Sequence, residues 1–154
     1  MEIVAAVYVD TMDFRQTPGP STRIDLTGVH FSAPADAPAP VTVTPHLLVL
    51  VWCPPDGKGT GALEVVFERA SGAGPADPAD TADAAGPGPG AGEGDEPEVV
   101  ARNVQPLQVE PGRFNYRLVR AELDFPTYGT VLARCRVDLG PVTTAPFTLL
   151  PPVP

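Results

Sequence analysis

The chain has 154 residues and a formal net charge of −9, from 10 basic and 19 acidic side chains. Seven of the acids lie in or beside one Gly-, Pro- and Ala-rich tract, and without them 12 acids and 10 bases leave a charge of −2. A nearly neutral folded part argues against nucleic acid or an anionic membrane as the main partner, because phosphate binding needs a clustered basic face.

The tract, residues 70–97, has a composition that cannot bury enough apolar area to offset an ordering entropy of about 1–2 kcal/mol per residue. We therefore predict a disordered acidic surface loop there. The 69 residues before it and the 57 after it are each too few for a robust core. We expect one domain over residues 1–154, interrupted by this loop, with an interaction segment or an interdomain linker as alternatives for the tract.

The N-terminal sequence "MEIVAAVYVD" has no basic region and only a short apolar run, so we expect no secretory signal. The longest apolar stretch, "LLVLVWC" at residues 47–53, is much shorter than the roughly 20 residues that span a bilayer. These features predict a soluble, cytoplasmic protein. Cys53 and Cys135 are expected to be buried free thiols, and a disulfide between them is the alternative.

In the first half of the chain, residues 2–9 are apolar and β-branched, which is typical of a strand buried on both faces. Residues 22–31 alternate between apolar and polar side chains, and Gly28 within them suggests a bulge that shifts the alternation. The Pro-rich residues 32–40 end this strand.

Residues 41–53 give the strongest strand signal, with Pro45 suggesting that their first half is an edge or bulged segment. Residues 54–61 contain the Asp-Gly pair of a tight turn, and residues 62–69 alternate clearly. We interpret the two strands as a hairpin. The residues of the second strand that we expect to face inward are Leu63, Val65 and Phe67, with Glu64 and Glu68 on the other face.

In the second half, residues 98–109 are predicted to be extended and broken at Pro106. Residues 110–123, 130–139 and 143–150 complete the pattern, and the last of these has a Pro at its edge. The alternating apolar residues of the first of these segments are Phe114, Tyr116 and Leu118, between Arg113, Asn115 and Arg117.

No ten-residue window has the apolar spacing of an amphipathic helix with a cap before it. Seven or eight short strands, separated by turn signals every 8–12 residues, favour an all-β, antiparallel two-sheet sandwich, immunoglobulin-like or jelly-roll-like. A small barrel is the alternative.

Catalytic patterns are weak. The three serines lie in loops or at strand ends without a G-x-S-x-G motif, so a serine hydrolase is not expected. A histidine beside a cysteine thiol would make a nucleophilic pair, but apolar flanks favour inert, buried cysteines. The serines are Ser21, Ser32 and Ser71, and the residues of the conceivable pairs are His30, His46, Cys53 and Cys135.

Metal and phosphate signals are equally weak, since the histidines and cysteines lack the paired spacing of zinc motifs. Asp10 and Asp13 provide oxygen ligands of the kind that Ca²⁺ prefers, but solvated loop acids are the commoner explanation. Residues 56–61, "DGKGTG", lack the full phosphate-loop motif and are interpreted as a β-turn. We predict no catalytic, cofactor-binding or metal-binding residues and no cofactor.

Two groups of side chains suggest binding. A basic stripe beside Asn115 would form if the strands that carry four arginines paired, but a solvated outer face paired with Glu64, Glu68 or Asp138 is the alternative. Trp52 and Tyr128 have the type of side chain that lines sugar-binding faces, although we expect Trp52 to pack inside. The four arginines are Arg113, Arg117, Arg134 and Arg136.

The segments "IDLTGVHFS", "HLLVLVW", "LEVVFER" and "VEPGRFNYRLV" together resemble a group of small uncharacterised bacterial proteins of unknown function. The resemblance covers most of the predicted folded part and implies a β-sandwich. The chain departs from the group in a Thr-Gly pair where paired glycines are expected and in its acidic insert. The resemblance transfers no functional residues.

We therefore expect a non-catalytic binding, accessory or structural module that engages another protein through an exposed strand edge, for instance around "VTVTPH" at residues 41–46. The alternative is a small-ligand-binding protein or enzyme with a pocket between the sheets. The sequence leaves open the partner or ligand, the strand order and the oligomeric state.

Overall fold

The structure, a computed structural model, describes residues 1–18, 22–70 and 96–154. Within these ranges the chain forms twelve strands, more than the seven or eight predicted, because several short strands pair beyond the main apolar runs. The strands are β1 (Glu2–Tyr8), β2 (Thr11–Gln16), β3 (Thr22–Thr27), β4 (Ser32–Pro34), β5 (Val41–Val43), β6 (His46–Trp52), β7 (Thr60–Arg69), β8 (Val99–Gln108), β9 (Phe114–Arg120), β10 (Leu123–Phe125), β11 (Gly129–Val137) and β12 (Thr143–Leu150).

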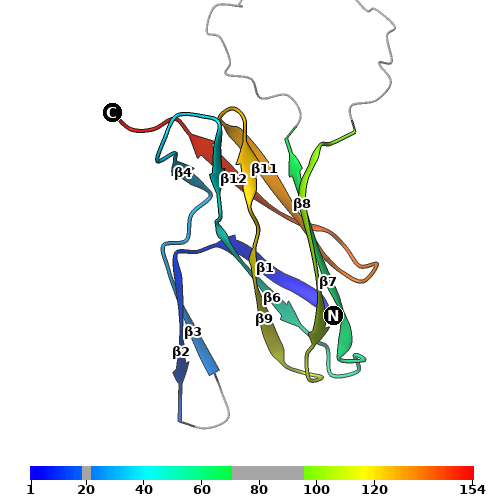
Figure 1. The fold of residues 1–154 in the computed structure, drawn as a ribbon. Helices are drawn as coiled ribbons and strands as arrows, with labels where there is room; N and C mark the ends of the chain where they lie inside the picture. The colour runs from blue at the N-terminus through cyan, green and yellow to red at the C-terminus, as the bar shows by residue number, and fades with distance from the viewer. Residues whose placement is uncertain (19–21, 71–95) are drawn as a thin grey trace, which may run out of the picture.

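The described strands form four sheets, so the all-β prediction is confirmed (Figure 1). One sheet has the order β1-β6-β9 and another the order β4-β12-β11-β7-β8. The short strands β5 and β10 pair with each other, and β2 and β3 form a hairpin that projects from the rest of the described chain. No helix occurs in the described residues, and so they contain none that could cross a membrane.

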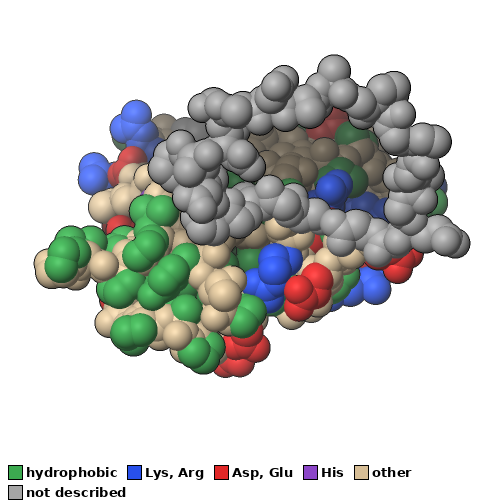
Figure 2. Space-filling view, turned by 90° about the horizontal axis from the view of Figure 1, so that it is seen from above, with side chains coloured by type: hydrophobic (Ala, Val, Ile, Leu, Met, Phe, Trp, Pro, Cys, Tyr) green, Lys and Arg blue, Asp and Glu red, His purple; other side chains and the backbone are tan. Residues whose placement is uncertain are grey.

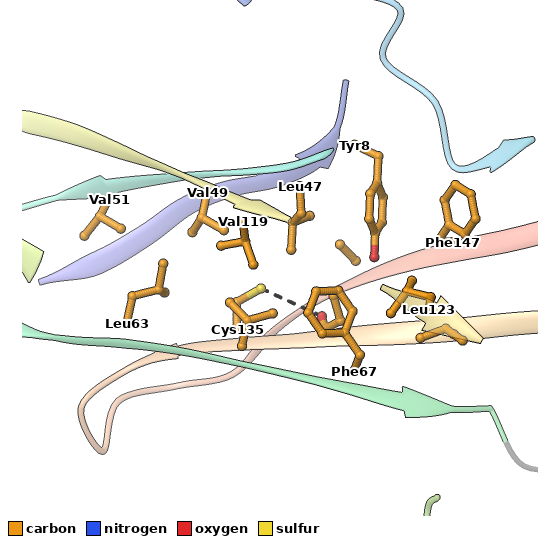
Figure 3. Packing of buried hydrophobic residues seen from close by; sticks show 14 of the residues in the cluster. Tyr8, Leu47, Val49, Val51, Leu63, Phe67, Val119, Leu123, Cys135 and Phe147 are labelled. Atoms are coloured by element: carbon orange, nitrogen blue, oxygen red, sulfur yellow. Dashed lines mark hydrogen bonds between the residues drawn. The ribbon is translucent and has the colours of Figure 1, made fainter. Parts of the chain in front are cut away.

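The main core lies between the two larger sheets (Figure 3). Leu47, Val49 and Val51 of β6 point toward Leu63 of β7 and Cys135 of β11, and all five are fully buried. Alternate residues of each strand enter this core because successive side chains of a strand point to opposite faces. The inward positions predicted for residues 62–69 are confirmed, since Leu63, Val65 and Phe67 are all buried core residues.

Strands from the two sides of the acidic tract pair directly. β7 runs antiparallel to β8, with Thr60 opposite Gln108 and Phe67 opposite Ala101. Both strands also supply buried residues to the same core cluster. The predicted loop over residues 70–97 falls almost entirely on residues 71–95, which lie outside the described ranges.

The predicted hairpin between residues 41–53 and 62–69 is wrong. β6 pairs with β1 and β9, whereas β7 pairs with β11 and β8, so the turn between them links two sheets. Alternation along each strand is the same whether two strands lie side by side or face each other across a core, and it therefore could not separate these cases. Pro45 was expected to lie within one strand with an edge or bulged first half. Instead it separates two strands, because β5 ends before it and pairs with β10, and β6 begins after it.

Only the second strand of the β2–β3 hairpin was predicted. Asp13, expected to be a solvated loop acid, lies on β2 opposite Asp25 of β3. Gly28 ends the hairpin with a left-handed φ of 66°, and a Cβ there would lie 1.9 Å from the carboxylate of Asp10. After this glycine the chain returns to the edge of β1, where the His30 N–H donates to the Tyr8 carbonyl.

Proline does not interrupt β8, contrary to the predicted break at Pro106. The N–H and C=O of its cross-strand partner Ala62 are bonded to Asp138, on the side away from β8. Pro106 therefore sits in a non-hydrogen-bonded pair with its nitrogen facing outward, where the missing N–H costs no ladder bond. Pro146 of β12 faces outward in the same way, since Thr148, two residues on, donates its N–H to Phe31 outside the β11 ladder.

Both cysteines are free and fully buried, as predicted. Cys135 lies in the core with its Sγ 3.9 Å from the Ala133 carbonyl oxygen, and burial raises the pKa of its thiol to about 12. Cys53 ends the β6 segment, with its Sγ 3.5 Å from the Pro54 carbonyl oxygen. Neither thiol has the exposure that a reactive cysteine needs.

A pair of matched tyrosine substitutions tests the packing of the core. The Tyr8 hydroxyl is buried without a hydrogen-bond partner among the described residues, whereas the Tyr128 hydroxyl accepts the Ala39 N–H at 3.2 Å. Tyr8→Phe should leave the free energy of unfolding unchanged or raise it, because a desolvated, unpaired group is removed. Tyr128→Phe should lower it by about 0.5–1.5 kcal/mol. Urea unfolding followed by circular dichroism measures both, and an equal loss in the two variants would contradict the assigned packing.

Candidate functional site

The outward face of the three-stranded sheet is apolar. Val119 is the fully buried core residue of β9, so the alternation places Phe114, Tyr116 and Leu118 on the outer side. The cross-strand pairs on this side are Trp52 with Phe114, Leu50 with Tyr116, and Leu48 with Leu118. Phe114 is 64% exposed, and Trp52 is only partly buried and lies outside the main core, so the packing expected for Trp52 is wrong.

Two neighbouring segments extend this surface. At a β-bulge in β1, Val4 follows the core-facing Ile3 and is 56% exposed. From the projecting hairpin, the ring of Phe14 contacts that of Tyr116 at a centroid distance of 4.8 Å, while 47% of Phe14 stays exposed. We call the surface formed by Val4, Phe14, Leu50, Trp52, Phe114, Tyr116 and Leu118 the β9 face.

The free edge of β9 is occupied by two of its own polar side chains. Asn115 accepts the Tyr116 N–H at 2.8 Å and donates to the Gln108 carbonyl of β8 at 2.7 Å. Arg117 donates to the Tyr116 carbonyl at 2.8 Å and to the Pro106 carbonyl at 3.2 Å. These side chains link the edge strands of the two larger sheets and satisfy backbone groups that an exposed edge would offer to another chain.

A shallow groove lies beside this link, where the chain passes from β8 to β9. Its volume is about 520 Å³, and its charged groups include an exposed Arg113–Glu110 ion pair at 2.9 Å. The groove is open to the surface, and its lining comes from β8, β9 and the turn between them. Its lining residues are Gln108, Val109, Glu110, Arg113, Phe114, Asn115 and Arg117.

The predicted basic stripe of four arginines does not form. β9 and β11 belong to different sheets, so Arg113 and Arg117 do not join Arg134 and Arg136. Arg134 pairs with Glu68, which the solvated-face alternative anticipated.

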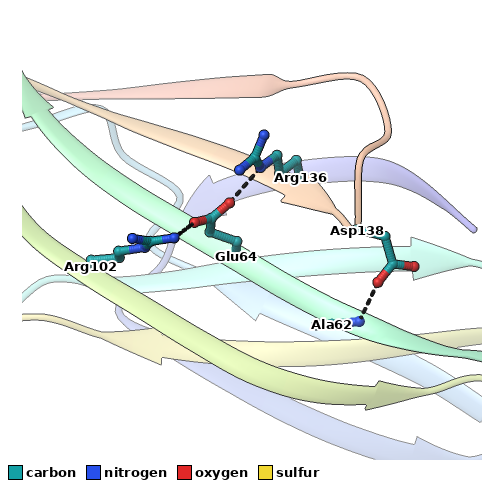
Figure 4. A network of polar contacts seen from close by, with 5 residues as sticks. All are labelled: Ala62, Glu64, Arg102, Arg136 and Asp138. Carbon is teal, nitrogen blue, oxygen red and sulfur yellow. Dashed lines mark hydrogen bonds and ion pairs between the residues drawn. The ribbon is translucent and has the colours of Figure 1, made fainter.

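Glu64 is the centre of the polar network on the outer face of the five-stranded sheet (Figure 4). Its carboxylate is bonded by both Arg136 and Arg102, from the strands on either side of β7. The hydrogen bond from Arg136, supported by Arg102, lowers the Glu64 pKa below its ordinary value of 4.5, against the opposing effect of desolvation. This satisfied network holds three strands in register and leaves no unpaired acid for chemistry.

The residues considered for catalysis are not brought together. His30 lies at the edge of β1, with its Nδ1 2.8 Å from the Gly28 carbonyl oxygen and 3.6 Å from Asp10. His46 begins β6 opposite Arg120, and no hydrogen bond joins a histidine to a cysteine in the described part of the chain. Asp13 lies on β2 opposite Asp25, whose carboxylate pairs with Arg15. Within the described ranges, no three His, Cys, Asp or Glu side chains cluster as metal ligands.

The segment proposed as an exposed strand edge already has a neighbour. Residues 41–43 form β5 and pair with β10, and Val41 and Val43 pack against the main core. Tyr128 also packs against this core. The edge at residues 41–46 therefore offers less apolar surface than the β9 face.

A second apolar surface lies at the end of the molecule that carries β4 and the C-terminal residue, where hydrophobic side chains gather on one side (Figure 2). Leu150, which is 44% exposed, lies beside Pro34 of β4 at this end. The β9 face carries four aromatic side chains in cross-strand and hairpin contacts.

No family model, curated protein or solved structure matches the chain. The β9 face is therefore identified from its own geometry. The alternation of Phe114, Tyr116 and Leu118 is evident from the sequence, but the side of the sheet that they face is not. The signal that could have indicated it is the apolar Val119 and Leu47 in the opposite register.

The Glu64 network predicts a specific loss of stability in acid. Because the folded-state pKa lies below 4.5, the contribution of Glu64 is complete above that value and is lost as the pH falls through the lowered pKa. Glu64→Gln should therefore destabilise the protein at pH 7, and the difference from wild type should shrink at pH 3. Urea unfolding at both pH values tests this. The control Glu110→Gln removes an exposed pair and should have little effect at either pH.

Substitutions of Asn115 test the link between the edges of β8 and β9, and we expect them to lower the stability of the protein by different amounts. Asn115→Ala removes two hydrogen bonds and should lower the free energy of unfolding by about 1–2 kcal/mol. Asn115→Asp keeps the acceptor for the Tyr116 N–H but loses the donor to Gln108, and should fall between Ala and wild type. Thermal and urea unfolding rank the three proteins, and identical stabilities would show that the link contributes nothing.

Proposed function

We propose that this protein is a non-catalytic binding module that engages a protein partner through the β9 face. We also propose that the two larger sheets form a two-layer sandwich of the immunoglobulin-like or jelly-roll-like kind that the sequence suggested. The shared core cluster of β1, β6, β9, β7, β11 and β12 supports this architecture.

The observation that carries the proposal is the apolar outer side of the three-stranded sheet, where aromatic and aliphatic side chains are exposed to water. Single exposed apolar residues are ordinary, but contiguous apolar patches rimmed by polar groups are typical of interaction sites. Phe114 and Leu118 lie on either side of Tyr116 along the outward side of β9. Trp52 lies opposite Phe114, and Phe14 reaches Tyr116 from the hairpin. Aromatic residues with arginines beside them are also the types enriched at interface centres.

The size of the face indicates a moderate affinity. Seven-residue strands β6 and β9 with β1 span about 15 Å by about 23 Å, roughly 350 Å². At about 25 cal/mol per Å², covering this area contributes about 9 kcal/mol before the cost of association, which is itself about 4–15 kcal/mol. Apolar contact alone therefore supports a reversible complex.

A photo-crosslinking amino acid at Leu118 should join the protein to one discrete partner in the cells that express it naturally, and the same group at Leu139 should not. Leu139 is a matched control because it is 92% exposed on a separate turn. Phe114→Asp should abolish the crosslink with little change in stability, since most of this ring is already in water. Mass spectrometry of the crosslinked band and a thermal melt are the measurements.

Equal labelling from positions 118 and 139, or a crosslink that survives Phe114→Asp in a folded protein, would contradict the proposal. Leu139→Asp serves as the second control, because it introduces the same charge outside the β9 face.

A further inference from the structure

The chemistry of the partner can be inferred from the groups beside the β9 face, an argument that rests on the proposed function. Backbone pairing along β9 is obstructed at its middle, since both the N–H and the C=O of Tyr116 are bonded by Asn115 and Arg117. Partner recognition at this place must therefore proceed through side chains and not through an added strand.

The positive charge beside the face is not neutralised within the described chain. Arg120 is exposed, shares the outward side of β9 with Leu118, and has no hydrogen bond or ion pair among the described residues. Arg117 lies on the opposite side of β9 from Leu118 and bonds only to two carbonyl oxygens at the edge toward β8, so it does not belong to the β9 face. Arg113 is paired with Glu110, and the pair is largely solvent-exposed.

Glu122 lies just beyond the end of β9, and no ion pair joins it to Arg120 in the described part of the chain. Glu2 lies opposite Trp52, at the end of the sheet away from Arg120, and His46 is the direct cross-strand neighbour of Arg120. On a chain with a net charge of −9, this edge of the β9 face is therefore a local site of unpaired positive charge. Opposite potentials across an interface steer association and exclude partners of like charge.

The area of the face also restricts its occupant. Stable complexes of two globular surfaces bury about 800 Å² on each partner, and the roughly 350 Å² estimated above is less than half of that. A second copy of this chain packing face to face would bury too little for a stable dimer. A short segment of another protein needs no larger surface.

We infer that the partner presents a short acidic segment whose apolar side chains cover Trp52, Phe114 and Leu118 while a carboxylate pairs with Arg120. The apolar contacts supply most of the affinity. Arg120 selects acidic over basic segments and makes association depend on salt.

Selection from a random twelve-residue peptide library displayed on phage tests this inference with the full chain as bait. Clones that also bind Phe114→Asp are removed, and the remaining peptides are expected to combine large apolar residues with an excess of Asp and Glu. A synthetic copy of the most enriched peptide should quench or shift the fluorescence of Trp52, the only tryptophan in the chain. Its affinity should weaken markedly between 50 and 500 mM salt.

Charge variants distinguish the inferred acidic segment from the proposed binding at the β9 face. Arg120→Glu should weaken the peptide by about fivefold or more, because one ion pair becomes a like-charge contact. Arg23→Glu, an equal charge change at an exposed residue on the side of the β2–β3 hairpin away from Phe14, should leave peptide affinity unchanged. Peptides that require Phe114 but show no acidic excess and no response to Arg120→Glu would overturn this inference and leave the proposed function standing. Failure to obtain any Phe114-dependent peptide would count against both.

Discussion

The antiparallel pairing of β7 with β8 is the interaction on which the rest of the structure depends. It joins residues 60–69 to residues 99–108 and so connects the parts of the chain on either side of the acidic tract. β7 also pairs with β11, which places Glu64 between two arginines on one face while Leu63 enters the core on the other. The ten-residue strand β7 thus contributes to both the charged outer surface of its sheet and the hydrophobic core.

From β8 the chain crosses to the other sheet, and this crossing determines the character of β9. Once Val119 occupies the core, period-two geometry leaves Phe114 and its alternating neighbours no position except the outside. Asn115 and Arg117 are directed toward the edge of β8, where their hydrogen bonds close that side of the molecule. The inward position of Val119 therefore explains both the hydrogen-bonded link from β9 to β8 and the apolar β9 face.

Sequence patterns sufficed for features that depend on local geometry. The all-β class, the inward residues of 62–69 and the buried thiols needed only alternation and composition. Features decided by distant partners could not be read in this way. β9 carries apolar residues in both registers, so its inward face depended on the opposing sheet, and Pro106 broke no ladder because the hydrogen-bonding side of β8 is set by β7. The β9 face depends on these two features, which are both set by strands distant in the sequence.

The outward-facing prolines have a consequence for behaviour at high concentration. Cross-β fibres grow when each new chain finds a continuous row of N–H donors on the strand before it. Pro106 near one margin of the five-stranded sheet and Pro146 toward the other each leave a gap in such a row. The edges of the five-stranded sheet thereby lack part of the backbone template on which further copies of the chain could stack.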